Sequence, residues 1–491
     1  MSNRVLILGL DGATFELIKP WADAGLLLAF KKVMDQGTYG ILKSSIPYYT
    51  IPAWISFATG CNPGEHGLFG FFKEGKKGYD YILNMNPSTL VKQKTLWQIL
   101  SDHKKTVGVI NVPGTYPPSK VNGYMVTSIL TPPDSPFTYP RSFEETINQF
   151  LGKYDIFFKN GSKDAYKVID NAYSLQDQRY RLAWYLWQKK KVDFLTVVDS
   201  GTDRVGHELF WCLDQNCKDR NYLLEYYSSV DVTLSKILSW LDDDTTLIIM
   251  SDHGMERLDR FLNLNAFLMS KGYLKVKNGI TNKIKKCMFD HNITPHNIYK
   301  ILRKLGLERL VIDGMNADQK FSLINKLFFS ANNIDWANTT AYASGTLNGI
   351  RINIKGRQPL GCVRKRDVES FKDKLILELL TWEDSGKRVI KRIDRSEDIY
   401  HGKYVKDAPD LVCDPIKGYE FFSAHGFAFK DLIVDSFGVS GCHNSDGIFI
   451  AYGKNIEHKI LDDANIIDIA PTVLNLMDVP ILENMDGKVL L

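Results

Sequence analysis

The chain has 491 residues, with 61 Lys and Arg against 57 Asp and Glu, which gives a formal net charge of +4. Hydrophobic residues make up 44% and charged residues 24%, proportions typical of a folded globular protein, so a disordered chain is excluded. The seven cysteines include no CxxC pair, which argues against a zinc ribbon or a redox dithiol, and we expect free thiols.

The first apolar run of the chain is short, covering residues 5–10, and it ends at Asp11. A signal peptide needs a longer apolar region and a small-residue cleavage site, and a membrane span needs about 18–20 apolar residues. Neither pattern is found in the sequence. We therefore expect a cytoplasmic protein without a membrane span.

Short β-branched runs that end on polar residues predict the strands of a buried sheet. The first four are residues 5–10, 107–112, 194–198 and 247–250. Continuous apolar runs of this length are typical of parallel strands buried on both faces, and segments with helical spacing, such as 222–241, lie between them. The alternation predicts an α/β fold with a mostly parallel central sheet between helices. Ligands bind such sheets at the carboxyl ends of the strands, where Asp11, Asp199 and Asp252 fall.

A basic segment follows this region. Residues 271–330 contain 12 Lys and Arg against four acids, a net charge of +8, and the spacing of their apolar residues is helical. We interpret residues 259–335 as an inserted helical lid over the site, with residues 1–258 and 336–491 forming the core. The charge of the lid is either a solvated face or an attraction for an anionic substrate.

Sheet and helix patterns return after the basic segment. Residues 349–354 and 447–451 are predicted strands, whereas residues 368–380 and 466–477 are predicted helices.

Separate segments contain residue types that bind metal ions. They supply three Asp and three His side chains: Asp11, Asp203, His207, Asp252, His253 and His443. Singly, each has a commoner explanation, because an Asp after a strand often caps a helix and an Asp/His pair four residues apart is often exposed. Together they suit zinc or a similar transition metal, and six ligands are too many for one tetrahedral ion. Two ions would stabilise both the attacking and the leaving oxygen in a displacement at phosphorus.

The order of these motifs resembles the alkaline phosphatase superfamily, and within it the type I phosphodiesterase/nucleotide pyrophosphatase family. Asp11 is followed by T-x-P-x-W-x-S-x-x-T-G-x-x-P-x-x-H-G starting at Thr50, then by D-x-x-x-H, S-D-H-G and a late G-x-H. The runs AYASGTLNGIRINIKGRQPLG at 341–361 and IIDIAPTVLNLMDVPILENMDGKVL near the C-terminus are also similar to that family.

The resemblance implies a two-metal phosphoesterase that hydrolyses a phosphodiester or pyrophosphate through a phospho-threonine intermediate on Thr50. It implies that one ion is surrounded by Asp11, Thr50, Asp252 and His253, and that the other is held by Asp203, His207 and His443. The ions are expected to be Zn²⁺, with Mn²⁺ as the alternative. Asp199 directly follows a strand and competes with Asp203, but the D-x-x-x-H spacing favours Asp203. The expected partner is a small phosphate ester, not a nucleic acid.

One position departs from the family pattern. Nucleotide pyrophosphatases have an Asn after the P-x-x-H-G turn that donates to the phosphoryl oxygen, and spacing puts Phe71 there in this chain. Asn62 is one alternative donor; otherwise the metals and the Thr50 backbone N–H would hold the oxygen. A phosphomonoesterase on the same scaffold is therefore a second hypothesis. A sulfatase is disfavoured, because the C/S-x-P-x-R motif is absent.

Aromatic residues surround the threonine motif in the sequence: Tyr48, Tyr49, Trp54, Phe69, Phe71 and Phe72. They either stack on the substrate or pack in the core beside the nucleophile.

Overall fold

The structure is a computed structural model that describes residues 4–491 with several gaps. The residues outside the description are 75–77, 80, 84–86, 158–163, 214–220, 305–322, 324–325, 344–347, 423–426, 428–429 and 438. Part of the predicted lid and part of the family-like run at 341–361 therefore lie outside the described residues.

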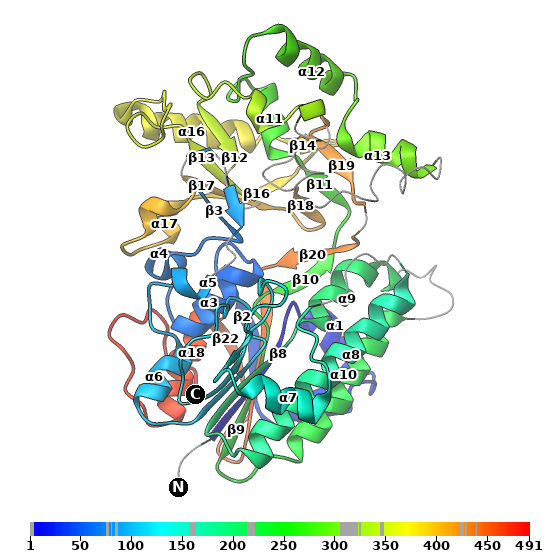
Figure 1. Ribbon diagram of the computed structural model, residues 1–491, viewed down its shortest axis with the longest axis vertical. Coiled ribbons are helices and arrows are strands. Elements are labelled where there is room, and N and C mark those ends of the chain that lie inside the picture. Colours follow the sequence, from blue (N-terminus) through cyan, green and yellow to red (C-terminus); the bar gives the residue numbers. More distant parts are fainter. Residues whose placement is uncertain are drawn as a thin grey trace.

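A nine-stranded sheet forms the centre of the lower lobe (Figure 1). In spatial order its strands are β22 (Lys459–Asn465), β2 (Thr38–Lys43), β21 (Asp446–Tyr452), β9 (Thr245–Met250), β1 (Arg4–Leu10), β8 (Phe194–Asp199), β5 (Val107–Ile110), β6 (Gly123–Val126) and β7 (Thr138–Tyr139). The strands from β9 to β6 are all parallel, whereas β21 runs antiparallel to β9 and β2, and β7 runs antiparallel to β6. The predicted mostly parallel α/β sheet is confirmed.

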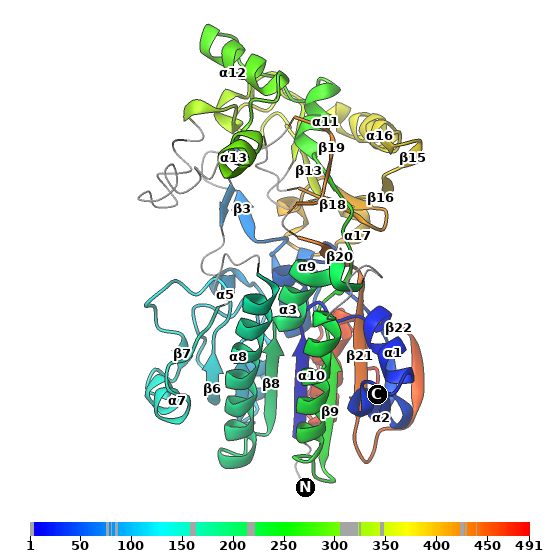
Figure 2. The same cartoon turned by 90° about the vertical axis from the view of Figure 1, so that its right-hand side faces the viewer.

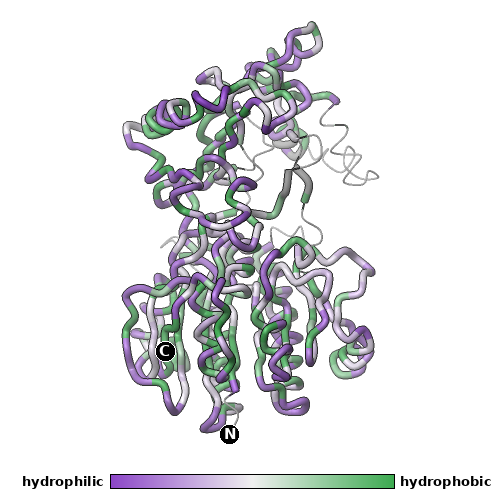
Figure 3. The backbone as a smooth tube through the Cα atoms, turned by 90° about the vertical axis from the view of Figure 1, so that its left-hand side faces the viewer, coloured by the Kyte–Doolittle hydropathy of each residue, from purple (hydrophilic) through white to green (hydrophobic). Residues whose placement is uncertain are grey.

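Helices cover both faces of this sheet because successive side chains of its strands point to opposite sides. Leu6 and Leu8 of β1 join one hydrophobic core, and Val5 and Ile7 join the other. The first core is closed by α1 (Phe15–Asp23), α2 (Leu28–Gln36), α7 (Phe143–Leu151), α8 (Ala165–Trp184), α9 (Gly201–Leu209) and α10 (Tyr222–Leu238), several of which lie in front of the sheet in Figure 2. The second is closed by α3 (Thr50–Thr59), α6 (Leu96–Asp102) and α18 (Ile469–Leu476). Hydrophobic segments accordingly run through the interior of the lower lobe in Figure 3.

The upper lobe has its own hydrophobic core. It contains a four-stranded sheet of β12 (Ala341–Ala343), β13 (Gly349–Ile352), β17 (Leu411–Pro415) and β16 (Ile390–Arg395), and a three-stranded sheet of β18 (Tyr419–Phe421), β11 (Arg260–Leu262) and β19 (Ile433–Asp435). Its helices include α11 (Leu264–Ser270), α12 (Ile280–Asp290), α13 (Pro295–Lys304) and α16 (Val368–Leu379).

This lobe differs from the lid expected at residues 259–335. Strands that follow residue 335 pack in the same core as α11, so the lobe extends well beyond that boundary. Helix α12 lies at the end of the upper lobe away from the nine-stranded sheet (Figure 1). The physical reason is that the segment around α11 buries its apolar residues against later strands, which sequence periodicity cannot reveal.

Two strands join the lobes. β10 (Gly254–Arg257) leads from β9 into the upper lobe, and β20 (Gly441–Asn444) leads back to β21. They pair antiparallel, with Gly254 opposite Asn444 and Met255 opposite His443. The chain thus enters and leaves the upper lobe beside two of the expected metal ligands, His253 and His443.

The remaining α-helices and strands are short. They are α4 (Pro63–His66), β3 (Phe72–Glu74), β4 (Tyr81–Leu83), α5 (Pro87–Leu90), β14 (Glu383–Asp384), β15 (Lys387–Arg388) and α17 (Ser396–Ile399). In the described part of the chain, no helix combines the length and the apolar character required to cross a membrane.

Candidate metal centre

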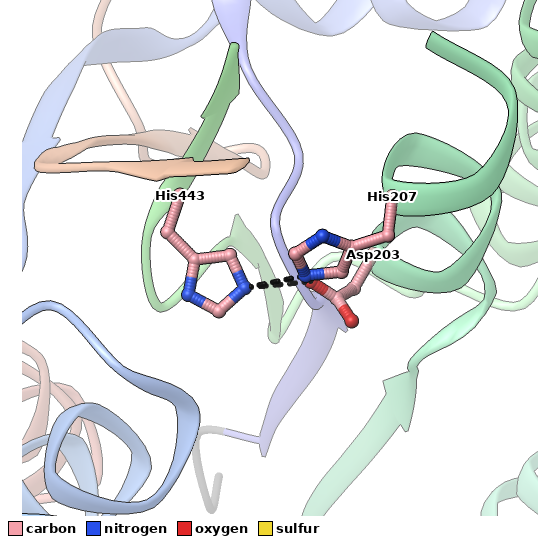
Figure 4. Close-up of side chains that lie close together, drawn as sticks. All are labelled: Asp203, His207 and His443. Atoms are coloured by element: carbon pink, nitrogen blue, oxygen red, sulfur yellow. Dashed lines mark hydrogen bonds and ion pairs between the residues drawn. The ribbon is translucent and has the colours of Figure 1, made fainter. Parts of the chain in front are cut away.

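Asp203, His207 and His443 form a first group of converging ligand atoms (Figure 4). Asp203 and His207 lie one turn apart on α9, and His443 comes from β20. The Nε2 atoms of the two histidines are 2.9 Å apart, and Asp203 Oδ1 lies 3.1 Å from His443 Nε2 and 3.3 Å from His207 Nε2. Ligands bound tetrahedrally at about 2.0–2.1 Å lie about 3.3 Å from one another. The triangle therefore has the dimensions that one small metal ion requires.

The other nitrogen of His207 supports this assignment. His207 Nδ1 lies 2.7 Å from the carbonyl oxygen of Gly441. A neutral imidazole carries one N–H, so donation from Nδ1 leaves the lone pair of Nε2 directed at the triangle, as in most histidine ligands of metals.

Asp11, Asp252 and His253 form a second group, which is buried. His253 Nε2 lies 3.5 Å from Asp11 Oδ1 and 3.2 Å from Asp252 Oδ2. Each of these three atoms is buried and has no hydrogen-bond partner among the described residues. Unpaired carboxylate oxygens are costly to bury, and a cation between them would satisfy all three atoms at once. The residues present therefore fit a bound metal ion.

The other oxygens of these carboxylates are held by the lower lobe. Asp11 ends β1 and Asp252 follows the adjacent β9, so the sheet brings them together. The backbone N–H of Gly12 donates to Asp252 Oδ1 over 3.2 Å, and the indole N–H of Trp54 donates to Asp11 Oδ2 over 3.3 Å. Gly12 has a φ of +69°, a left-handed conformation that favours glycine. One oxygen of each carboxylate is thus fixed, and the other faces the group.

The charge balance of the two groups differs. Burial, followed by repulsion from neighbouring carboxylates, raises the pKa values of Asp11 and Asp252 well above the usual range. Burial also acts to raise the pKa of Asp203, but His207 and His443 outweigh it and lower that pKa. The pKa of His207 is raised to about 9, because Asp203 outweighs burial. A bound cation would therefore stabilise the carboxylates of the second group more than the carboxylate of the first.

The two groups are adjacent. The rings of His253 and His443, one from each group, stack with centroids 3.7 Å apart and an interplanar angle of 24°. Two-metal sites that act on phosphate esters hold their ions about 3.5–4 Å apart. The stacked rings therefore place the two groups of possible ligands side by side.

Thr50 is the first residue of α3 and is buried. The preceding Tyr49 packs its ring on His443 at 6.0 Å, and Trp54, one helical turn after Thr50, donates to Asp11. Thr50 therefore lies between a residue that contacts the first group and one that contacts the second. Backbone N–H groups at the N-terminus of a helix point outward along the helix axis and attract anions such as phosphate. In α3 these groups belong to Thr50 and Ile51, because Pro52 has no N–H and the N–H of Ala53 donates to the carbonyl of Tyr49.

Asp199 belongs to a different cluster from Asp203. Its carboxylate is fully buried and accepts from the hydroxyl of Tyr226 at 2.9 and 3.0 Å and from the backbone N–H of Gly201 at 2.8 Å. The Arg179 guanidinium lies 3.9 Å away. Asp199 therefore anchors the start of α9, whereas Asp203 belongs to the first group of possible metal ligands.

Asn62 lies past the end of α3 opposite Thr50, where it caps α4. Its side-chain oxygen accepts from Gly64 N at 2.8 Å, and its amide nitrogen lies 2.9 Å from Asp486 Oδ2 and 3.1 Å from His401 Nε2. These contacts occupy the amide, so the structure offers no support for Asn62 as a donor to substrate.

Phe71 and the other aromatic residues near Thr50 fall into different environments. Phe71 packs against Ile51 and neighbouring apolar residues beside the start of α3. Trp54 and Phe69 pack in two separate hydrophobic cores. The aromatic residues therefore do not form one stacking surface.

A cavity of about 290 Å³ lies next to His443 between the lobes. Its wall includes Tyr48, Asp414, Lys391 and Lys417, and the Tyr48 hydroxyl donates to Asp414 over 3.0 Å. Polar side chains of the upper lobe thus line a cavity that also borders His443, a residue of the first group.

Sequence reasoning missed Glu420. This residue belongs to β18 of the upper lobe, and its negative charge helps to raise the pKa of His207. Its own pKa is raised by burial. No motif marks Glu420, because only the tertiary fold brings it near the first metal group.

Comparisons with known proteins identify the family of this chain and structures with a similar fold. The profile of the type I phosphodiesterase / nucleotide pyrophosphatase family matches residues 5–431. A sequence comparison with curated proteins finds no match.

Three solved structures illustrate the similarity of fold. Human ectonucleotide pyrophosphatase/phosphodiesterase 5 has 14% sequence identity, a TM-score of 0.55 and coverage of 99% of this chain and 97% of its own. Phosphonoacetate hydrolase from Sinorhizobium meliloti 1021, in complex with phosphonoformate, has 12% identity, a TM-score of 0.55 and coverage of 97% and 96%. The murine ectonucleotide pyrophosphatase/phosphodiesterase 5 in complex with AMP has 12% identity, the same TM-score and coverage of 99% and 97%.

Proposed function

This chain belongs to the type I phosphodiesterase/nucleotide pyrophosphatase family, and from that membership we propose that it hydrolyses a phosphodiester or pyrophosphate bond, with Thr50 as nucleophile and two divalent ions at the two ligand groups. The observation that carries the proposal is the pair of adjacent three-ligand groups, one of which has three buried ligand atoms without partners. The mixed Asp and His donors suit Zn²⁺ best, with Mn²⁺ as the alternative.

When bound, two divalent ions would stabilise negative charge on the phosphoryl group and lower the pKa of a hydroxyl beside them. The residues of the chain would position the substrate and the attacking hydroxyl. Thr50 Oγ would attack phosphorus as the bond to the leaving oxygen breaks, and water would then break the Thr50 Oγ–P bond and restore the hydroxyl. The backbone N–H of Thr50 would donate to a phosphoryl oxygen, in place of the donor that family members have at the position of Phe71.

The position of Phe71 favours a diester over a monoester. Its partly exposed ring packs on the buried cluster of Ile51, Ile55 and Leu68 along the start of α3. A monoester dianion presents a second ionised oxygen, which is poorly solvated beside an apolar ring, whereas a diester presents an organic group that can pack on it.

A substrate panel tests this proposal. We would measure kcat/KM at pH 8 with added Zn²⁺ or Mn²⁺ for an aryl phosphodiester, an aryl phosphomonoester and a dinucleotide pyrophosphate. We expect kcat/KM for the aryl phosphodiester or for the dinucleotide pyrophosphate to exceed kcat/KM for the monoester at least about tenfold. A faster monoester reaction would instead identify a phosphomonoesterase.

Substitution of the nucleophile tests the mechanism separately. Thr50→Ala is expected to lower kcat by more than about a hundredfold without unfolding the protein. The matched control is Thr59→Ala at the other end of α3, where the hydroxyl donates only to the carbonyl of Ile55. Retention of more than about a hundredth of kcat in Thr50→Ala would show that another group attacks.

A further inference from the structure

Helix α12 in the upper lobe presents apolar side chains to solvent. Ile280 is 79% exposed and Ile284 is 55% exposed, and Lys283 and Cys287 on the same stripe are also exposed. These four residues have the i, i+3, i+4, i+7 spacing of one helix face. Two solvent-exposed isoleucines one turn apart are unusual for a helix face that has no partner.

The opposite side of α12 is anchored. Phe289 is 2% exposed, and its ring lies 5.3 Å from that of Phe329 and 6.1 Å from that of Phe427. The helix is therefore held by a buried aromatic contact. The other face of α12, with Ile280 and Ile284, is therefore exposed while the helix is packed on the lobe.

The surroundings of the stripe are strongly basic. Residues 271–304 contain nine Lys and Arg against a single acid, Asp290, a net charge of +8, whereas the whole chain carries +4. Lys275, Lys277 and Lys283 are exposed. Long lysine side chains beside apolar residues can keep their charges in water while their stems lie along an apolar surface.

The stripe is far from the metal centre in the fold. Helix α12 lies at the end of the upper lobe, while the metal groups lie where the nine-stranded sheet meets the connecting strands β10 and β20 (Figures 1 and 2). Its charge and apolar residues therefore act on something other than the reacting phosphate.

We propose that the exposed face of α12, with the surrounding lysines, docks this protein on an anionic phospholipid surface. Charge complementarity selects the partner, because a +8 segment is attracted to anionic headgroups and two isoleucines can enter the boundary between headgroups and acyl chains. A nucleic acid would be recognised through stacking aromatic residues, and the stripe contains none. A stripe of two turns on one helix is narrow for a stable protein–protein interface, whereas a lipid interface accepts a single helix.

Vesicle co-sedimentation of the full chain tests the proposal. We expect binding to vesicles of phosphatidylcholine and phosphatidylglycerol to exceed binding to phosphatidylcholine alone at least about tenfold, and to fall as salt is raised. The double variant Ile280→Ser/Ile284→Ser should lose most of this binding. The control Leu377→Ser, which removes a 67% exposed leucine from α16, should bind like the wild type.

A second measurement tests contact by the helix itself. For this measurement an environment-sensitive fluorophore is attached to Cys287 in the variant C217S/C362S, so that the label does not react at those two cysteines. The fluorescence emission should shift to the blue with anionic vesicles and not with neutral ones. Three results would overturn the proposal: no binding to anionic vesicles, equal binding by the double variant and the wild type, or a dimer in gel filtration that only the double variant dissociates. The last result would make the stripe a contact with a second copy of the chain. Thermal unfolding of each variant checks that folding is unchanged.

Discussion

The indole N–H of Trp54 donates to Asp11 Oδ2 across 3.3 Å, and this bond fixes the start of α3 against the end of β1. Thr50 lies one turn before Trp54 on the same side of α3. A single buried hydrogen bond therefore connects the position of the proposed nucleophile to that of a proposed metal ligand.

Replacing Trp54 with Phe tests this connection. A smaller aromatic ring remains in the core and Asp11 Oδ2 loses its donor, so we expect kcat to fall about 10- to 100-fold, as after loss of a contact that orients a metal ligand. The fall should be accompanied by weaker metal binding in equilibrium dialysis. Trp97→Phe removes the same ring volume from the same hydrophobic core, so it is the control and should retain activity and metal affinity. Equal behaviour of the two variants would mean that Trp54 serves only the core.

Removal of metal should abolish activity. We expect dialysis against a chelator to inactivate the protein, Zn²⁺ or Mn²⁺ to restore activity, and metal analysis of the restored protein to find two ions per chain. His443→Ala removes one ligand of the first group and should reduce the content toward one ion. Full activity in a protein that holds one ion or none would contradict the two-metal proposal.

Asp199 and Asp203 should respond differently to substitution by Asn. Asp199→Asn weakens buried hydrogen bonds to Tyr226 and Gly201, so we expect a loss of about 1–3 kcal/mol in the free energy of unfolding, with two ions still bound. Asp203→Asn should leave stability less affected and lower the metal content of the purified protein. Denaturant unfolding and metal analysis of both variants decide between them. The reverse pattern would assign Asp199 to the metal centre.

His66 gives the fold a dependence on pH that is independent of the metal groups. Burial, only partly opposed by Asp486, lowers the pKa of His66 to about 3, and its Nε2 lies 3.0 Å from the Ser56 hydroxyl. The folded state keeps this imidazole neutral while the unfolded state binds a proton below about pH 6.5. Stability is therefore complete above pH 6.5 and declines as the pH falls toward 3, by up to about 1.4 kcal/mol per pH unit.

The variant His66→Gln checks this expectation, because a glutamine amide can donate to Ser56 but does not titrate. We expect the free energy of unfolding to decline less steeply with falling pH in the variant than in the wild type between pH 6.5 and 4. Parallel curves for the two proteins would show that His66 is protonated in the folded state.

The amino-acid sequence by itself predicted the central sheet and the residues that meet at its edge. The apolar runs before Asp11 and Asp252 are continuous because parallel strands are buried on both faces, and their carboxyl ends must share one edge. His207 follows Asp203 by one helical turn, so their convergence is also local. These features depend on neighbours in the chain and on strand direction, which sequence patterns report.

Only the tertiary structure decided the extent of the upper lobe and the partners of residues that are distant in sequence. β11 pairs with β18, so residues near 260 and 420 form one sheet and bring Glu420 toward His207. Asn62 is occupied by Asp486, 424 residues away in the chain. Strand pairing and side-chain contacts across such separations depend on which buried surfaces fit together, and the spacing of residues within one segment carries no information about that fit.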